Sequence, residues 1–222
     1  MDVFHMHTYQ FNDEQIAKCK AFANEIAWKH NDFMDRRNNH TRTTRQKEID
    51  ILQGKLAEVA IYELLKSKYP TASIAPVDFE VYPDGEFDQG DIFIDDLVFS
   101  IKSSKPGSSV LMLETARFLT DDAGNLIGLE GNELPDVLSF VQVDVAKKEA
   151  IIAGFITTTK FWKEKVFLPR GFIMNHHNAK TALIEKIPPK LTSFFTSKGI
   201  PLRADNYAIH KQYLLNLEQI MK

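Results

Sequence analysis

The stretch GDIFIDDLVFSIKSS, residues 90–104, decides the fold that this sequence predicts. Two short apolar runs flank Asp95 and Asp96, which predicts an antiparallel hairpin with a two-residue turn. Opposed residues of such a hairpin share one face of the sheet. The predicted pairs are Ile94 with Leu97, Phe93 with Val98, Ile92 with Phe99 and Asp91 with Ser100.

Three polar residues interrupt the apolar pattern of this hairpin, namely Asp91, Ser100 and Lys102. The strand period of two carries Lys102 to the face of Ser100 and Asp91, while Ile92, Ile94, Phe99 and Ile101 fill the other face. We therefore expect an acid and a lysine to cluster at one end of the hairpin. A register slip of one residue would send Lys102 to the face opposite Asp91.

The flanking sequence predicts two helices before the hairpin. Asn12 begins a helical pattern that runs from about residue 13 to 34, and Thr43 or Thr44 caps a second helix that runs to about Lys68, before Pro70. The other expected elements are a half-buried strand at 77–81, strands at 137–145 and 150–157, and a final helix from about 205 to 221. This order predicts an α/β or α+β fold around a mostly antiparallel sheet.

Composition limits the class of protein. The chain has 222 residues, 44% of them hydrophobic, which is enough for one sizeable core in a single domain. Cys19 is the one cysteine, so no disulfide can form within the chain. No signal segment and no apolar run of about 18 residues is present, so we expect a cytoplasmic protein without a membrane partner.

Charge distribution says more than net charge, which is −3. Residues 36–47, RRNNHTRTTRQK, carry five Arg or Lys and no acid, whereas acids gather between Asp78 and Asp96. Proteins that grip phosphate and hold a divalent cation share this pattern, and so do many ordinary surfaces.

The polar residues of the hairpin suit metal-assisted hydrolysis of a phosphodiester. Asp91 and Glu58 offer hard oxygen ligands to Mg²⁺, and the backbone carbonyl of Ile101 can supply another. The metal would make phosphorus more electrophilic and activate water. Lys102 would place a compact positive charge beside the scissile phosphate.

The run GKLAEVAIYELL at 54–65, with Glu58, followed by Asp91 and then Ser100-Ile101-Lys102, resembles the PD-(D/E)XK nuclease superfamily, especially type II restriction endonucleases. The resemblance covers roughly residues 45–165 and includes PDVLSFVQVDV and AIIAGFITTTKFW. It implies a restriction-endonuclease-like αβββαβ core with a central mixed sheet flanked by helices. It also implies a Mg²⁺-dependent enzyme, with Mn²⁺ as a substitute, that cuts double-stranded DNA as a homodimer at a short palindromic site.

Under this resemblance the whole chain, residues 1–222, is one nuclease domain with three parts. Residues 1–44 would form the N-terminal helix and a basic DNA-contact segment, and 45–165 the catalytic core. Residues 166–222 would serve recognition or dimerisation.

Two positions depart from the family pattern. Gly90 stands where the family name has Pro, and Ser100 stands where an Asp or Glu normally provides the second metal ligand. Some enzymes of this pattern recruit a later acid, which makes Glu114 a candidate, and Glu58 could serve equally. If neither reaches the metal, the domain would bind DNA without cutting it. A phage, repair or junction nuclease of the same superfamily is the other alternative.

Seven residues are candidates for contacts to DNA. Arginine grips phosphates bidentately or recognises guanine edges, and a small polar loop suits backbone contacts near the scissile bond. The arginines are Arg36, Arg37, Arg42 and Arg45, and the loop residues are Ser103, Ser104 and Lys105. The alternatives are a solvated charged segment and a plain connecting turn.

Each catalytic candidate also has a purely structural interpretation. Asp91 could be a strand-end acid satisfied by backbone amides, and Lys102 could extend from a strand edge to solvent. Glu58 could be a surface acid that pairs with Lys55 or Tyr62. The two tryptophans, Trp28 and Trp162, are expected in the core.

Overall fold

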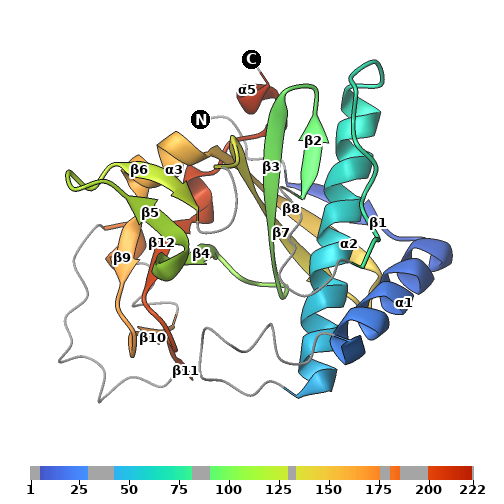
Figure 1. Ribbon diagram of the computed structural model, residues 1–222, viewed down its shortest axis with the longest axis horizontal. Helices are drawn as coiled ribbons and strands as arrows, with labels where there is room; N and C mark the ends of the chain where they lie inside the picture. The colour runs from blue at the N-terminus through green and yellow to red at the C-terminus, as the bar shows by residue number, and fades with distance from the viewer. Residues whose placement is uncertain are drawn as a thin grey trace. The chain divides into compact units, whose positions relative to one another are not determined.

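The computed structural model describes residues 6–29, 43–81, 91–129, 134–175, 181–185 and 200–221. The chain divides into two compact units. The first comprises Met1–Ser108, Pro135–Thr157 and Leu215–Lys222, and the second comprises Ser109–Leu134 and Thr158–Leu214. The chain therefore passes from the first unit to the second twice, and Figure 1 labels the elements of both. The predicted division into three functional parts stays a prediction.

The first unit is a five-stranded mixed sheet flanked by helices, which confirms the predicted mixture of helices and a sheet. Its elements are β1 (His7–Gln10), α1 (Asp13–Lys29), α2 (Thr44–Lys68), β2 (Ile92–Ile94), β3 (Leu97–Ser104), β7 (Val137–Asp144), β8 (Glu149–Thr157) and α5 (Leu217–Ile220). The strand order is β1-β8-β7-β3-β2. Three of the neighbouring pairs are antiparallel, and β3 runs parallel to β7.

Helix α2 begins where the sequence predicts, because Thr43 and Gln46 form a capping box. The backbone N–H of Gln46 donates to the Thr43 hydroxyl, and the Thr43 N–H donates to the Gln46 side chain. Helix α1 is confirmed over Asp13–Lys29, and the rest of its predicted length lies outside the described residues.

The core of the first unit lies between the helices and one face of the sheet. Helix α2 packs on β3, β7 and β8, and α1 packs on α2 (Figure 1). The core includes Cys19 and Ala23 of α1, Leu56, Val59, Ala60 and Leu64 of α2, Ile92 and Ile94 of β2, Phe99 and Ile101 of β3, and Val141 and Val143 of β7.

The hairpin has the predicted register. Ile92 pairs with Phe99, Phe93 with Val98 and Ile94 with Leu97. Asp136 then joins β7 to β3, because its carboxylate accepts the Val98 N–H at 2.8 Å and its own N–H donates to the Val98 carbonyl at 2.9 Å. This double contact sets the start of the parallel pairing.

The predicted strand at 77–81 is wrong, because the structure gives no strand there. Its alternating apolar residues were the signal for a strand. Instead, the Asp78 carboxylate accepts the N–H of Glu80 at 2.7 Å, and the Asp78 carbonyl accepts a hydrogen bond from Lys55. Local and side-chain partners thus take the place of a strand ladder.

The second unit contains short strands around a small core. Its elements are β4 (Val110–Glu114), a 3-10 helix (Thr115–Arg117), β5 (Phe118–Thr120), β6 (Leu126–Leu129), α3 (Thr158–Glu164), β9 (Val166–Leu168), β10 (Ile173–Met174), β11 (Ile200–Pro201), β12 (Asn206–His210) and a 3-10 helix (Lys211–Tyr213). The sheets are β4-β12-β9, β10-β11 and β5-β6. The core residues are Val110, Leu168, Phe172, Ala182, Leu183 and Ala208.

The predicted C-terminal helix over 205–221 is wrong. Asn206–His210 is strand β12, which pairs with both β4 and β9, and only Leu217–Ile220 is α-helical. Residues 206, 208 and 209 are buried and the other two are half-buried, and strand pairing on both sides overrides the helical spacing that the sequence suggested.

The two tryptophans differ. Trp28 is 68% exposed, which contradicts its predicted core position. The buried stripe of α1 runs through Cys19, Ala23 and Ala27, and Trp28 lies one residue off that stripe, about 100° around the helix. Trp162 is half-buried in an aromatic cluster with Phe118, Tyr207 and the Lys165 ammonium.

In the described part of the chain, no helix has the length and apolar character needed to cross a bilayer.

Candidate functional site

Glu58 lies in the middle of α2, with the buried residues Ala57 and Val59 on either side. Only 9% of Glu58 is exposed. A carboxylate at such a position needs a charged or hydrogen-bonding partner, because an unpaired buried charge is costly. The sequence placed Glu58 at the border of the apolar face, and the structure buries it further than that.

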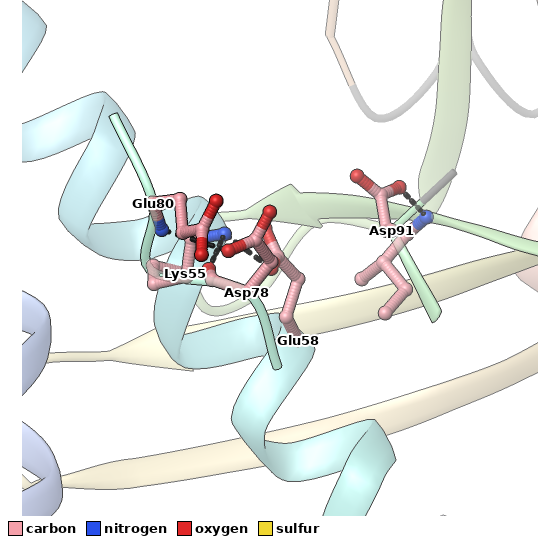
Figure 2. Close-up of polar contacts among 6 residues, drawn as sticks. Lys55, Glu58, Asp78, Glu80 and Asp91 are labelled. Atoms are coloured by element: carbon pink, nitrogen blue, oxygen red, sulfur yellow. Dashed lines mark hydrogen bonds and ion pairs between the residues drawn. The ribbon is translucent and has the colours of Figure 1, made fainter. Parts of the chain in front are cut away.

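Lys55 provides the partner of Glu58. Its Nζ lies 2.5 Å from Oε2 of Glu58 and 2.9 Å from the carbonyl oxygen of Asp78, as Figure 2 shows. The two side chains are only 10% and 12% exposed, and the ammonium also lies 4.8 Å from the ring centre of Phe22. The alternative that Glu58 pairs with Lys55 is therefore confirmed, although the pair is buried and not on the surface.

The charges of Glu58 and Lys55 affect the pKa of Cys19. Burial, reinforced by the negative charge of Glu58, raises the pKa of the Cys19 thiol to about 11. The thiol is therefore protonated at neutral pH. A protonated, fully buried thiol is neither a nucleophile nor a metal ligand, which leaves the chemistry of this region to its carboxylates.

Asp91 stands at the open end of the hairpin. Its N–H donates to the Phe99 carbonyl at 3.1 Å, and its carboxylate accepts the backbone N–H of Ile101. Figure 2 shows Asp91 apart from the group formed by Lys55 and Glu58. The alternative that backbone amides satisfy Asp91 is thus confirmed for one of its oxygens. A carboxylate has about four acceptor positions, so this contact leaves room for a further partner.

The carbonyl of Ile101 lies at the same edge of β3 as the Asp91 carboxylate. In a β-strand the N–H and C=O of one residue face the same neighbour. Since the Ile101 N–H donates to Asp91, the Ile101 carbonyl oxygen faces that side too. The structure therefore brings together two of the predicted oxygen ligands.

Ser100 and Lys102 occupy the other face of β3 from the helices. Phe99 and Ile101 belong to the core under α2, and strand alternation turns Ser100 and Lys102 away from it. Both residues are half-buried, and they pair in the parallel register with Leu138 and Phe140 of β7. Glu58, on the helix side, does not share this face.

Glu114 is the last residue of β4, where it pairs with Asn206 of β12. Both residues belong to the second unit. The structure describes Glu114 only within that unit, so its predicted role beside Asp91 stays a prediction.

The oxygen ligands of the hairpin suit Mg²⁺ that keeps most of its waters. Mg²⁺ is commonly bound by one or two carboxylates together with substrate phosphates. Asp91 offers one such carboxylate, and it accepts the Ile101 N–H. Across the described ranges, no three His, Cys, Asp or Glu side chains gather in a way that could hold a metal by themselves. Any metal here would thus rely on water and substrate oxygens.

The predicted DNA contacts are described in part. Arg36, Arg37 and Arg42 lie outside the described residues. Arg45 is exposed at the start of α2 and pairs with Glu48 at 2.8 Å, so it is already engaged at the surface.

The loop candidates Ser103, Ser104 and Lys105 are also described. The first two were expected in a loop, and this is wrong, because β3 continues through both by pairing with Val141 and Gln142 of β7. Lys105 follows the strand and is exposed.

Two residues near the candidate site escaped the sequence analysis. Lys55 appeared only as a possible partner of Glu58, and its helical spacing of three residues from Glu58 was the available signal. Gln142 was predicted only as one residue of the strand at 137–145. A lone amide inside the run VLSFVQVDV was the signal for a polar task at that position.

Comparisons with protein-family models, with curated proteins and with solved structures found no match to this chain.

Proposed function

We propose that the protein is a Mg²⁺-dependent endonuclease that hydrolyses phosphodiester bonds of double-stranded DNA. The observation that carries the proposal is the Asp91 carboxylate held at the Ile101 backbone, on a strand that also bears Ser100 and Lys102. The finer assignments belong to the same proposal: a restriction-endonuclease-like αβββαβ core, a type II restriction role and a homodimer acting on a short palindromic site. Two-fold symmetry of the protein would match two-fold symmetry of the DNA.

Asp91 and the Ile101 carbonyl would hold the ion in this proposal. The hydrogen bond from the Ile101 N–H orients the Asp91 carboxylate along the strand edge, so little rearrangement is needed before binding. When bound, Mg²⁺ supplies Lewis acidity toward the scissile phosphate and toward water.

Lys102 would act on the phosphate and the attacking water. Its ammonium is a compact positive charge with three donors, and it would offset negative charge that grows as the phosphorus is attacked. Its position two residues after Ser100 places both side chains on one face of β3.

The identity of the remaining oxygen ligand has three candidates, Ser100, Glu58 and Glu114. Glu58 carries a full charge, but Lys55 neutralises it at 2.5 Å. Ser100 offers a weaker, neutral hydroxyl on the face of Lys102. The proposal therefore assigns Asp91 the main share of metal binding and leaves the second protein ligand to experiment.

The test is digestion of mixed genomic DNA by the purified protein with Mg²⁺ or Mn²⁺, followed by sequencing of fragment ends. We expect cleavage that disappears on chelation and that returns fragment ends with a shared short sequence. Lys102→Ala should lose cleavage while duplex binding persists. Lys147→Ala removes an exposed ammonium, 74% accessible, and is the matched control. A parent protein without cleavage under either metal would overturn the proposal.

A second candidate function is DNA binding without cleavage. Two observations favour it: Ser100 replaces the usual acid, and the helix acid Glu58 is already paired with Lys55. Under this candidate the parent would bind duplex DNA but leave it intact with both metals, and Lys102→Ala would change only binding.

A further inference from the structure

A tight turn follows the strand that carries Lys102. Its four residues are Lys105, Pro106, Gly107 and Ser108. Gly107 has φ of +86°, and the Ser108 N–H donates to the Lys105 carbonyl at 3.4 Å. Proline at the second position and a glycine with positive φ at the third are the signature of a type II turn. Gly107 is needed here because side chains disfavour this φ.

The side chain of Gln142 holds this turn with both ends of its amide. Its Oε1 accepts the Gly107 N–H at 2.9 Å, and its Nε2 donates to the Ser108 carbonyl at 2.8 Å. Gln142 is the partner of Ser104, the last residue of β3, in the parallel register. The Gln142 amide thus forms hydrogen bonds to the chain just after the end of β3.

Gln142 would destabilise the folded protein at this buried position if its amide did not form these contacts. It is 4% exposed, and the neighbouring residues Val141 and Val143 of β7 are buried apolar side chains. A buried primary amide without hydrogen-bond partners loses its hydration and gains no contact to replace it. Both the oxygen and the nitrogen of the Gln142 amide therefore need partners. The Gly107 N–H and the Ser108 carbonyl both belong to the turn, which indicates that Gln142 holds the turn in place.

We infer that Gln142 is a positioning residue for DNA binding, which fixes the turn so that Lys105 meets a backbone phosphate next to the scissile bond. This inference rests on the proposed function. Lys105 is exposed and lies three residues after Lys102. A turn that is already ordered loses little freedom on binding, so each contact it makes contributes more affinity.

The experiment measures duplex affinity as a function of salt for four proteins: the parent, Gln142→Leu, Lys105→Ala and the double variant. Loss of one phosphate contact lowers the slope of log affinity against log salt by about 1. We expect that drop in Lys105→Ala, most of it in Gln142→Leu, and no further drop in the double variant.

A purely structural role for Gln142 predicts a different pattern. Loss of stability alone would leave the salt slope of the folded fraction at the parent value. Its effect on the apparent affinity would also add to the effect of Lys105→Ala instead of overlapping with it. Either result would overturn the inference. Gln142→Glu is a second variant that keeps an acceptor for Gly107 but loses the donor to Ser108, and we expect an intermediate salt slope.

Gln10→Leu is the matched control for removal of an amide. Gln10 donates to Glu149 at 2.8 Å at an exposed site on β1, and its loss should leave the salt slope unchanged. The two proposals fail separately. A parent that cuts DNA while Gln142→Leu behaves like the parent overturns only the role of Gln142, whereas a parent that neither binds nor cuts DNA overturns both.

Discussion

The hairpin end around Asp91 and the middle of α2 around Glu58 hold their carboxylates in opposite ways. Asp91 accepts a neutral backbone N–H from Ile101, whereas Glu58 contacts the ammonium of Lys55 at 2.5 Å. A neutral partner orients a carboxylate and leaves its charge uncancelled. An ammonium cancels that charge before any cation arrives.

This difference shows that an acidic residue type alone is a poor guide to a metal ligand. Both acids satisfy the sequence pattern equally, but the sequence alone does not reveal that Glu58 contacts an ammonium while Asp91 contacts a backbone N–H. The comparison assigns metal binding to the hairpin and a structural task to the helix pair. The following experiments test that division.

The largest expected effect is on cleavage. Asp91→Asn keeps the shape and one acceptor oxygen of Asp91 but removes its charge, and Lys102→Ala removes the ammonium. Each should lower the cleavage rate by roughly 10²-fold or more, in the range seen when one group that stabilises a transition state is removed. Rates from single-turnover assays measure this. A similar loss in Glu58→Gln would break the comparison, because it would give Glu58 the same role as Asp91.

The next effect is on stability. Lys55→Met keeps most of the length of Lys55 but removes the ammonium that contacts the buried Glu58 carboxylate, which should lower the free energy of unfolding by about 3 kcal/mol. The double variant Lys55→Met with Glu58→Gln should recover much of that loss. Denaturant unfolding measures both. Equal losses in the single and double variants would show that Lys55 acts through its contact with Asp78 and not through Glu58.

A cap variant separates stability from function. Thr43→Ala removes the side-chain cap of α2 about four helical turns from Glu58, and it should cost about 1 kcal/mol of unfolding free energy. Cleavage at a temperature well below unfolding should not change. A loss of cleavage in Thr43→Ala at that temperature would show that stability alone limits activity.

The smallest effect uses Cys19 as a sensor of Glu58. Because the pKa of Cys19 is raised from 9.0 to about 11 in the folded protein, the native state holds its proton more tightly than the unfolded state. This contribution to stability is complete below about pH 9 and is lost as the pH rises toward 11. Comparison of the parent with Cys19→Ala by alkaline unfolding isolates it. In Glu58→Gln the loss should still begin near pH 9, which the unfolded state sets, but it should end at lower pH and be smaller, since one cause of the raised folded-state pKa has been removed.

Local patterns were enough to predict the hairpin and the long helix. The register from Ile92 to Phe99 follows from a two-residue turn, and the start of α2 follows from Thr43 and Gln46, so both depend on neighbours in sequence. The Asp91, Ser100 and Lys102 pattern could be placed for the same reason.

The errors occurred where distant partners decide the structure. Residues 77–81 alternate like a strand, but the Lys55 side chain occupies the carbonyl of Asp78. Residues 206–210 have helical spacing with their neighbours, but β4 and β9 flank them on both sides. The burial of the Lys55 and Glu58 pair likewise depends on packing against α1, which no local pattern reveals.

The sheet of the first unit is assembled from segments that are synthesised far apart in time. Strand β1, at His7–Gln10, has its partner in β8 at Glu149–Thr157, and Phe155 of β8 in turn bridges to Leu215. A nascent chain must therefore wait for roughly 140 further residues before β1 can pair, about 7 to 28 seconds at ordinary rates of translation. Until then β8 has not been synthesised, so β1 has no partner strand. We therefore expect slow, late folding with a high contact order, and a dependence on cellular factors that protect the emerging chain.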